Sequence, residues 1–252
     1  MYAAQDYEPR QLVIVSDGRE EFTALRDHAE RVCRSGVAAT WVERGSLSLG
    51  ALRNLSIELA AGDIVAQWDD DDLSHPRRLS VQYDCMQREG ALACVLADHL
   101  HWVAGTRSLY WCDWTRPRGV ASRTSGLPCT IMCHTAAAPR YPDSGPLSRR
   151  SEDAVFARAL LERGAVASSS GSGWAYVYVV HGANTWDEPH YRRIVAATAM
   201  TADDLECRRN ELAAAVETYA LGADVTVRDH LDLPVLSLSQ QGAHEPATSR
   251  FV

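Results

Sequence analysis

Four consecutive aspartates, Asp69 to Asp72, are the residues of this sequence with the clearest chemical meaning. They directly follow an apolar run, Ile64 to Trp68, which has the length and composition of a buried strand. Four adjacent carboxylates repel one another, and a divalent cation such as Mg²⁺ or Mn²⁺ relieves that repulsion. The alternative is a solvated acidic turn that caps a helix beginning near Pro76. Because ligands of open parallel sheets bind beyond the carboxyl ends of the strands, the position of the run favours a binding site.

Glu152 and Asp153 form a second acidic pair, which follows Ser151 at the predicted start of a helix. Ser is a common N-cap, and acids in the first turn are favoured by the helix dipole, so a purely structural role is the plain alternative. The same placement offers a carboxylate held on a rigid element, suited to act as a general base towards a hydroxyl.

His181 is a third candidate, because it ends the apolar run Ala175 to Val180 and precedes Gly182 and Asn184. A His at such a strand end is often an ordinary loop residue. Imidazole is also a frequent metal ligand, and a strand end can face the same site as the acidic run.

The elements that must position these residues alternate between strand and helix in the first half of the chain. The spacing of apolar residues, glycines and Pro76 predicts strands over 12–16, 37–42 and 64–68, and helices over 20–34, 49–61 and 76–89. This alternation is typical of parallel strands joined by helical crossovers. The second half predicts a hairpin within 91–114, strands over 129–134 and 175–181, and helices over 151–163 and 202–221.

Composition limits the function classes that remain. The chain has 252 residues, of which 46% are hydrophobic and 23% charged, and its net charge is −8. The negative charge argues against a nucleic-acid partner, since binding a polyanion needs clustered Lys and Arg. No stretch approaches the roughly 18 apolar residues of a membrane span. The seven cysteines are scattered, which favours a reduced cytoplasmic protein, and Cys129, Cys133 and His134 lack the second ligand pair of a zinc site.

These residues, in this order, resemble family 2 glycosyltransferases of the GT-A fold. The resemblance extends from about Gln5 to Trp186. It rests on segments that recur at the family's spacing: Gln5-Asp6-Tyr7, Ser16-Asp17-Gly18, Gly50 with Arg53-Asn54, Gly62 to Ala66, Asp69 to Asp72, Pro76 with Leu79, Glu152-Asp153, His181-Gly182 and Asn184-Thr185-Trp186.

The resemblance implies an α/β fold of GT-A type. It predicts a Rossmann-related, mostly parallel sheet with helices on both faces, and a smaller antiparallel region on the acceptor side. We expect one structural domain, in which residues 1–100 bind the donor, 101–200 bind the acceptor and provide catalysis, and 201–252 form a C-terminal helix and tail.

The resemblance also implies a role for each site residue. Residues assigned to the nucleotide-sugar are Asp17 at the base, Arg53 in the nucleotide pocket, Asp69 and Asp70. The two acids of the DxD motif would be Asp69 and Asp71, which contact the ribose and the metal bound to the diphosphate. Metal ligands would come from Asp69, Asp71, Asp72 and His181. Asp153 would be the catalytic base, with Glu152 beside it oriented towards the acceptor.

We therefore expect a metal-dependent, inverting glycosyltransferase that uses Mn²⁺ or Mg²⁺ and moves a sugar from a nucleotide-sugar, UDP-sugar by preference, to a hydroxyl of a glycan or small molecule. Trp102, Trp111 and Trp114 are candidate sugar-stacking side chains, or else core aromatics. The alternatives are a non-catalytic protein that binds nucleotide or glycan, and a sugar-nucleotide pyrophosphorylase, whose glycine-rich stretch the sequence lacks. The oligomeric state stays open, a homodimer included.

This sequence departs from the family in one respect. Members of the family place an apolar strand before the equivalent of Gln5, whereas this sequence starts at Met1 and has no such strand there. An apolar segment near the other end of the chain, residues 234–239, has the length of a strand and begins with Pro234. We predict that this segment fills the position of the absent strand in the sheet, within one chain or exchanged between two, because an unpaired apolar strand would favour aggregation. The alternatives are a strand docked elsewhere on the surface and a truncated N-terminus.

Overall fold

The computed structural model describes residues 1–16, 27, 38–43, 47–117, 125–164 and 166–239. Two compact units make up the chain, and their segments alternate along it. Unit 1 contains residues 1–70, 76–96 and 123–169, and unit 2 contains residues 71–75, 97–122 and 170–252. The boundary between them therefore falls inside the acidic run, between Asp70 and Asp71. The predicted division into donor and acceptor segments concerns function and stays a prediction.

Unit 1 holds two sheets. One is a parallel pair, β1 (Gln11–Ser16) with β2 (Ala38–Glu43), and the other has four strands in the order β3-β8-β5-β9. Its members are β3 (Ile64–Ala66), β5 (Ala93–Leu96), β8 (Leu127–His134) and β9 (Val166–Ser169). β5 and β9 run parallel, whereas β8 is antiparallel to both β3 and β5, so the sheet is mixed rather than mostly parallel.

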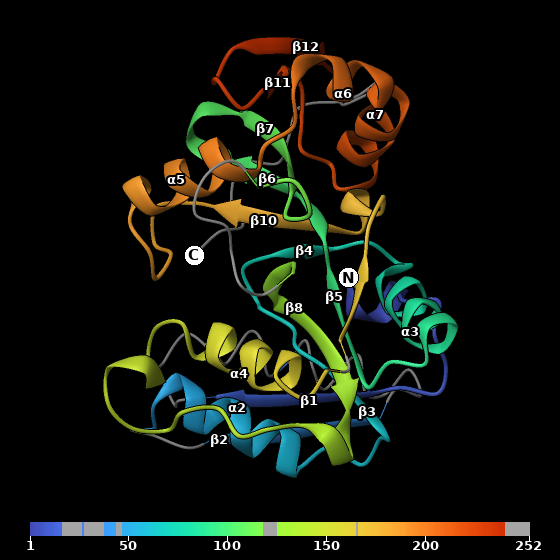
Figure 1. The fold of residues 1–252 in the computed structure, drawn as a ribbon, viewed down its shortest axis with the longest axis vertical. Helices are drawn as coiled ribbons and strands as arrows, with labels where there is room; N and C mark the ends of the chain where they lie inside the picture. The colour runs from blue at the N-terminus through green and yellow to red at the C-terminus, as the bar shows by residue number, and fades with distance from the viewer. Residues whose placement is uncertain (17–26, 28–37, 44–46, 118–124, 165, 240–252) are drawn as a thin grey trace. The chain divides into compact units, whose positions relative to one another are not determined.

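Helices cover both faces of the four-stranded sheet, as predicted. Cys94 and Met132 pack against α3 (Arg78–Glu89), while Val95 and Ile131 pack against α4 (Glu152–Leu161). Figure 1 shows these two helices on opposite sides of β5 and β8. The alternation follows from the pleat of the strands, which directs successive side chains to opposite faces. Both helices bury their apolar stripe in this way, and α3 ends at Gly90, whose φ of 60° is the left-handed conformation that glycine adopts at low cost.

Unit 2 is built on a six-stranded sheet in the order β12-β11-β7-β6-β10-β4. The strands are β4 (Leu73–Ser74), β6 (Asp98–Val103), β7 (Ser108–Asp113), β10 (Tyr176–Val180), β11 (Val225–Arg228) and β12 (Pro234–Leu238). β6 and β7 form the predicted antiparallel hairpin, and β10 runs parallel to β6. The antiparallel part of the fold is therefore more extensive than the small region expected.

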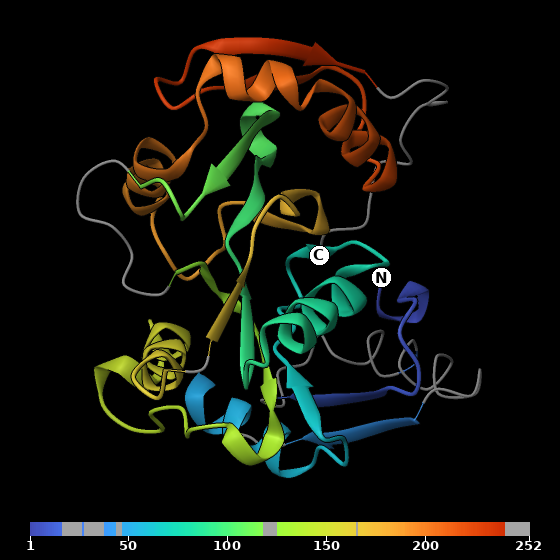
Figure 2. The same ribbon diagram turned by 45° about the vertical axis from the view of Figure 1, so that its right-hand side comes forward.

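Three helices flank this sheet. Leu205 of α6 (Ala202–Cys207) and Leu212 of α7 (Arg209–Thr218) pack on one face, and α5 (Glu188–Thr198) packs on the other face through Val195. In Figure 2 the orange and red helices α6 and α7 lie beneath β12. The single helix predicted over 202–221 is thus two helices, which meet at Arg208 (φ −104°, ψ 14°). Trp102 and Trp111 belong to this core, so their interpretation as sugar-stacking residues is wrong.

The segment Pro234–Leu238 is a strand, as predicted, but its partner is different. β12 pairs antiparallel with β11 at the edge of the unit 2 sheet. Leu236 and Leu238 point into the core there, whereas Ser237 is exposed. The prediction that this segment fills a position in the sheet of β1 within the chain is therefore wrong, because the β11 edge already pairs with it. In the described part of unit 1, β1 has β2 as its hydrogen-bonded neighbour.

No helix in the described part of the chain combines the length and the apolar character needed to cross a membrane. The predicted helix over residues 20–34 and Asp17 lie outside the described residues. Helix α2 (Leu49–Glu58) confirms the helix predicted over 49–61. A short 3₁₀ turn that was not predicted, η6 (Gly173–Ala175), precedes β10. Helix α2 ends at Glu58 with Leu59 as its C-cap, three residues before the predicted end.

Candidate active site

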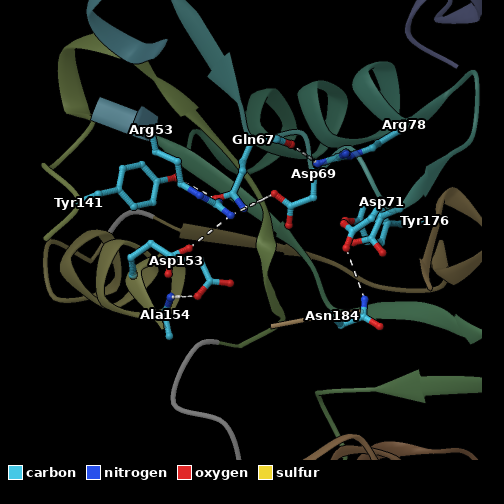
Figure 3. A network of polar contacts seen from close by, with 12 residues as sticks. Arg53, Gln67, Asp69, Asp71, Arg78, Tyr141, Asp153, Ala154, Tyr176 and Asn184 are labelled. Atoms are coloured by element: carbon cyan, nitrogen blue, oxygen red, sulfur yellow. Dashed lines mark hydrogen bonds and ion pairs between the residues drawn. The ribbon is translucent and has the colours of Figure 1, made fainter. Parts of the chain in front are cut away.

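Arg53 is the centre of the polar cluster in unit 1. Its Nη2 lies 3.1 Å from Oδ1 of Asp69 and 3.3 Å from Oε1 of Glu152, so one guanidinium pairs with an acid after β3 and an acid at the start of α4 (Figure 3). Burial alone would lower the pKa of Arg53, but the neighbouring Asp69, Tyr141 and Glu152 outweigh it and raise that pKa. Arg53 therefore keeps its charge and offsets the repulsion between the two carboxylates.

The helix that carries Arg53 is fixed by a close backbone contact. Ser48 caps α2 by accepting the N–H of Ala51 at 3.2 Å. The side chain of Asn54 bonds to both the backbone oxygen and the backbone N–H of Tyr141, at 2.9 and 2.8 Å. A Cβ at Gly50 would lie 1.9 Å from the carbonyl oxygen of Pro142, so only glycine permits this approach.

The end of β3 is held by residues that the sequence analysis did not select. Gln67 donates to Oδ1 of Asp69 at 3.1 Å and accepts the hydroxyl of Tyr141 at 2.8 Å. The fully buried Arg78 donates from Nη2 to the backbone oxygen of Gln67 at 2.7 Å, and its guanidinium lies 4.9 Å from the ring centroid of Trp68. Arg78 is the first residue of α3, and the sequence gives no signal that its side chain is buried.

Glu152 and Asp153 differ in their surroundings although they are adjacent. Glu152 is buried, and that burial raises its pKa, while Arg53 acts in the opposite direction. Asp153 is only half-buried, and its Oδ1 accepts the N–H of Ala154 at 2.7 Å. Asp153 is thus the more accessible of the two acids, and its role as a base stays a prediction. Glu152 is bound to Arg53, and its orientation towards an acceptor also stays a prediction.

The residue before this pair has an unusual backbone. Ser151 lies at the N-cap position with φ 62° and ψ 16°, in the left-handed region, and its side chain makes no capping bond. The predicted capping role of its hydroxyl is therefore wrong. A non-glycine residue in this conformation costs about 1–3 kcal/mol, and such strain is found most often at functional sites.

A second polar cluster, in unit 2, joins the acidic run to the end of β10. Oδ2 of Asp71 lies 3.2 Å from Nε2 of His181. The side-chain amide of Asn184 donates to the same oxygen at 3.4 Å (Figure 3). Asn184 also donates to the backbone oxygen of Val179 and accepts the N–H of His181, at 2.9 Å each, which fixes the turn after β10. The sequence placed Asp71 and His181 in one metal site, and the structure brings their side chains together.

Asp72 is placed differently from its neighbour. It is buried, its Oδ1 accepts the backbone N–H of Val179 at 2.8 Å, and its Oδ2 accepts the hydroxyl of Tyr176. Both oxygens are thus engaged in holding β10, so Asp71 is the better candidate for a metal ligand. Asp70 is exposed.

The Asp71–His181 pair fits a divalent cation. Adjacent ligand atoms in an octahedral shell with bonds of 2.0–2.1 Å are separated by roughly 3 Å, close to the separation observed here. Both side chains are partly exposed, which leaves room for water or phosphate oxygens. One carboxylate and one imidazole form a donor set that Mn²⁺ accepts well.

Comparison with known proteins supports the fold. No family model matches the sequence, and no curated protein matches it. Among solved structures, residues 1–349 of S. aureus TarS in complex with UDP-GlcNAc share 15% identity at a TM-score of 0.57, over 77% of this chain and 58% of that one. The same TarS fragment with UDP gives 17% identity and a TM-score of 0.54, over 77% and 63% of the two chains. The chain spans less than two thirds of the structures it matches. It has the GT-A-like fold that its sequence predicts.

Proposed function

We propose that this protein is a glycosyltransferase that takes its sugar from a nucleoside-diphosphate sugar and binds a divalent cation at Asp71 and His181. The observation that carries the proposal is the 3.2 Å contact between these two side chains, which come from the acidic run and from the end of a strand 110 positions later. In a GT-A-like fold, this pair provides an anchor for the diphosphate of a donor. The TarS structures with UDP and UDP-GlcNAc support a uridine nucleotide as the first ligand to test.

The bound cation, Mn²⁺ or Mg²⁺, would neutralise the departing nucleoside diphosphate as a Lewis acid. Arg53 and Asp69 would line the nucleotide pocket in the same proposal, with Arg53 kept charged by its two acidic partners. Asp70 is exposed beside Asp69, and Asp17 completes the proposed donor residues outside the described part of the chain.

Asp153 would act as the general base. Its carboxylate takes the proton of the acceptor hydroxyl while the oxygen forms a bond to the anomeric carbon and the bond to the nucleoside diphosphate breaks. Attack from the face opposite the leaving group inverts the configuration at that carbon. The N–H of Ala154 fixes Oδ1 of Asp153, so the carboxylate is already oriented before the acceptor binds.

Thermal unfolding of metal-free protein with UDP, with Mn²⁺, and with both together tests this proposal. A ligand at about 100 times its dissociation constant adds about 2.7 kcal/mol of stability, which corresponds to roughly 5–11 °C in melting temperature for a chain of this size. We expect a shift of that size with UDP and Mn²⁺ together, and little with UDP alone. Adenosine monophosphate with Mn²⁺ serves as the control nucleotide.

A panel of UDP-sugars, followed by an assay for donor hydrolysis, separates the candidate functions. Stabilisation together with release of UDP supports the transferase. Stabilisation without any turnover favours a non-catalytic nucleotide-binding protein. If no nucleotide changes the melting temperature in the presence of Mn²⁺, the proposal is wrong.

A further inference from the structure

Three side chains that the proposed transfer does not use lie together on one face of the unit 2 sheet. His99 and His101 are two positions apart on β6 and therefore point to the same face, and Cys112 of β7 is directly opposite His99. Helix α5 covers this face: its Tyr191 lies 5.9 Å from His101 between ring centroids, and its Val195 packs with Cys112.

All three side chains are buried. His99 and Cys112 are fully buried, and His101 is 1% exposed. Nε2 of His99 and both ring nitrogens of His101 have no hydrogen-bond partner among the described residues. Buried polar atoms are nearly always paired, because leaving them unpaired costs stability, so three unpaired nitrogens at one place need an explanation.

The protonation states in this layer suit a metal ion. Burial lowers the pKa of His101 to about 4 and that of His99 well below its usual value, so both rings are neutral and keep a free lone pair near pH 7. Burial also raises the pKa of the Cys112 thiol to about 12, so without an ion it stays protonated. A cation stabilises the thiolate and thereby offsets this effect.

The three donor atoms also lie close enough together to bind one ion. One nitrogen from each imidazole and Sγ of Cys112 all lie within 4.8 Å of one another. A tetrahedral Zn²⁺ with bonds of 2.0–2.3 Å separates its ligand atoms by roughly 3.5 Å, so small side-chain rotations are enough to close the site. Two imidazoles and a thiolate are softer donors than the carboxylate at Asp71, and they select zinc rather than magnesium.

We propose that His99, His101 and Cys112 bind one zinc ion, which ties β6 to β7 beneath α5. Binding forms two nitrogen–zinc bonds and one sulfur–zinc bond, and the thiol proton of Cys112 leaves to solvent. A water molecule completes the four-coordinate shell. The site is separate from the residues proposed for the nucleotide-sugar, and it does not depend on that function.

Trp114 provides a specific check on the proposal. Its indole N–H donates to Nδ1 of His99 at 3.3 Å, and the two rings are stacked with 6.3 Å between centroids. Since an indole only donates, this contact places the proton of the neutral His99 on Nε2. A metal bound to Nδ1 would displace the indole N–H. A metal bound to Nε2 would move the proton of His99 to Nδ1, which could then no longer accept from the indole. Removing the indole N–H should therefore strengthen zinc binding.

The test uses the whole protein, dialysed against a chelator and titrated with Co²⁺ and then with Zn²⁺. We expect one equivalent of Co²⁺ with a thiolate-to-cobalt charge-transfer band, which Zn²⁺ displaces. His101→Phe is the key variant, because Phe keeps the flat stack on Tyr178 (5.4 Å between centroids, 9° between planes) and removes two unpaired nitrogens. It should fold at least as stably as the parent without metal, and bind zinc at least about 100-fold more weakly.

Two further variants complete the design. Cys112→Ser should lose the charge-transfer band, whereas Cys207→Ser, a change at an exposed thiol, should retain it. Trp114→Phe should bind zinc more tightly than the parent. The proposal is overturned if the parent binds no zinc, or if His101→Phe or Cys112→Ser binds it as tightly as the parent. Stabilisation of His101→Phe by UDP with Mn²⁺ should equal that of the parent, so failure of the zinc site and failure of the proposed transferase give different results.

Discussion

Replacing Arg53 with Met tests whether one buried guanidinium holds the unit 1 cluster together. The substitution keeps most of the side-chain volume and removes the charge that pairs with Asp69 and Glu152. Arg53 is 16% exposed, Asp69 20% and Glu152 4%, so the two acids lose their partner in a mostly dry environment. Breaking such a pair costs about 3–5 kcal/mol, and the partial exposure of Asp69 places the expected loss near the lower value.

The loss of stability caused by Arg53→Met should depend on pH because of Glu152. Burial already raises the pKa of its carboxyl, and removing Arg53 takes away the largest influence that lowers it, so that pKa rises further. An acid whose pKa is higher in the folded than in the unfolded state favours folding at low pH, and this contribution is lost as the pH rises through the folded pKa. The destabilisation by Arg53→Met should therefore be large at pH 8 and smaller near pH 4.

Urea unfolding at both pH values, followed by circular dichroism, measures the effect. Arg140→Met is the matched control, because Arg140 pairs with Glu58 on the surface, where the two side chains are 67% and 54% exposed, and such pairs contribute about 0–1 kcal/mol. Adding Glu152→Gln to Arg53→Met should restore at least about 1 kcal/mol at pH 8. A stability of Arg53→Met equal to that of the parent at pH 8, or a loss of the same size at both pH values, would refute the reasoning.

The remaining predictions concern the donor site, the base, the fold around α2 and the edge of unit 2. Asp71→Ala should abolish stabilisation by UDP with Mn²⁺ without lowering the melting temperature of the free protein; tight binding by the variant would contradict the assignment. Asp153→Asn should keep donor affinity and reduce transfer at least about 100-fold, and near-parental turnover would leave this acid with a helix-dipole role. Gly50→Ala should cost at least about 1–3 kcal/mol in urea unfolding, because the new Cβ meets backbone that cannot move freely. Leu236→Ala should cost about 2–4 kcal/mol, whereas Ser237→Ala, on the exposed face of β12, should be nearly neutral; equal effects would contradict the placement of this strand.

The elements around the acids could be predicted because their signals are local. β1, β3 and β10 are short apolar runs that end at polar residues, and α3 is bounded by Pro76 and by Gly90 in the left-handed conformation. Each of these signals depends only on residues adjacent in the sequence.

Other features depend on contacts that the local pattern does not contain. The break between α6 and α7 leaves Leu205 and Leu212 seven positions apart and both in the core, so the apolar spacing is the same as in one continuous helix. The pairing of β12 was mispredicted because an apolar pentapeptide fits any open edge, and the partner strand β11 has only four residues. Helix α5 was not predicted, although its sequence carries a local signal. Asp187 is its N-cap, and a proline lies in its first turn.

The acidic run shows the same limit at the candidate site. The sequence presents four identical side chains, and repulsion between them predicts a cation without saying which acids bind it. The structure separates them by their partners: Asp69 pairs with Arg53, Asp72 accepts two bonds that hold β10, and Asp71 faces His181 while remaining partly exposed. An acid whose oxygens are already satisfied by buried donors gains little from a cation, whereas a partly exposed acid beside an imidazole gains most. Among these carboxylates, Asp71 is therefore the one whose removal should affect ligand binding and leave the fold unchanged.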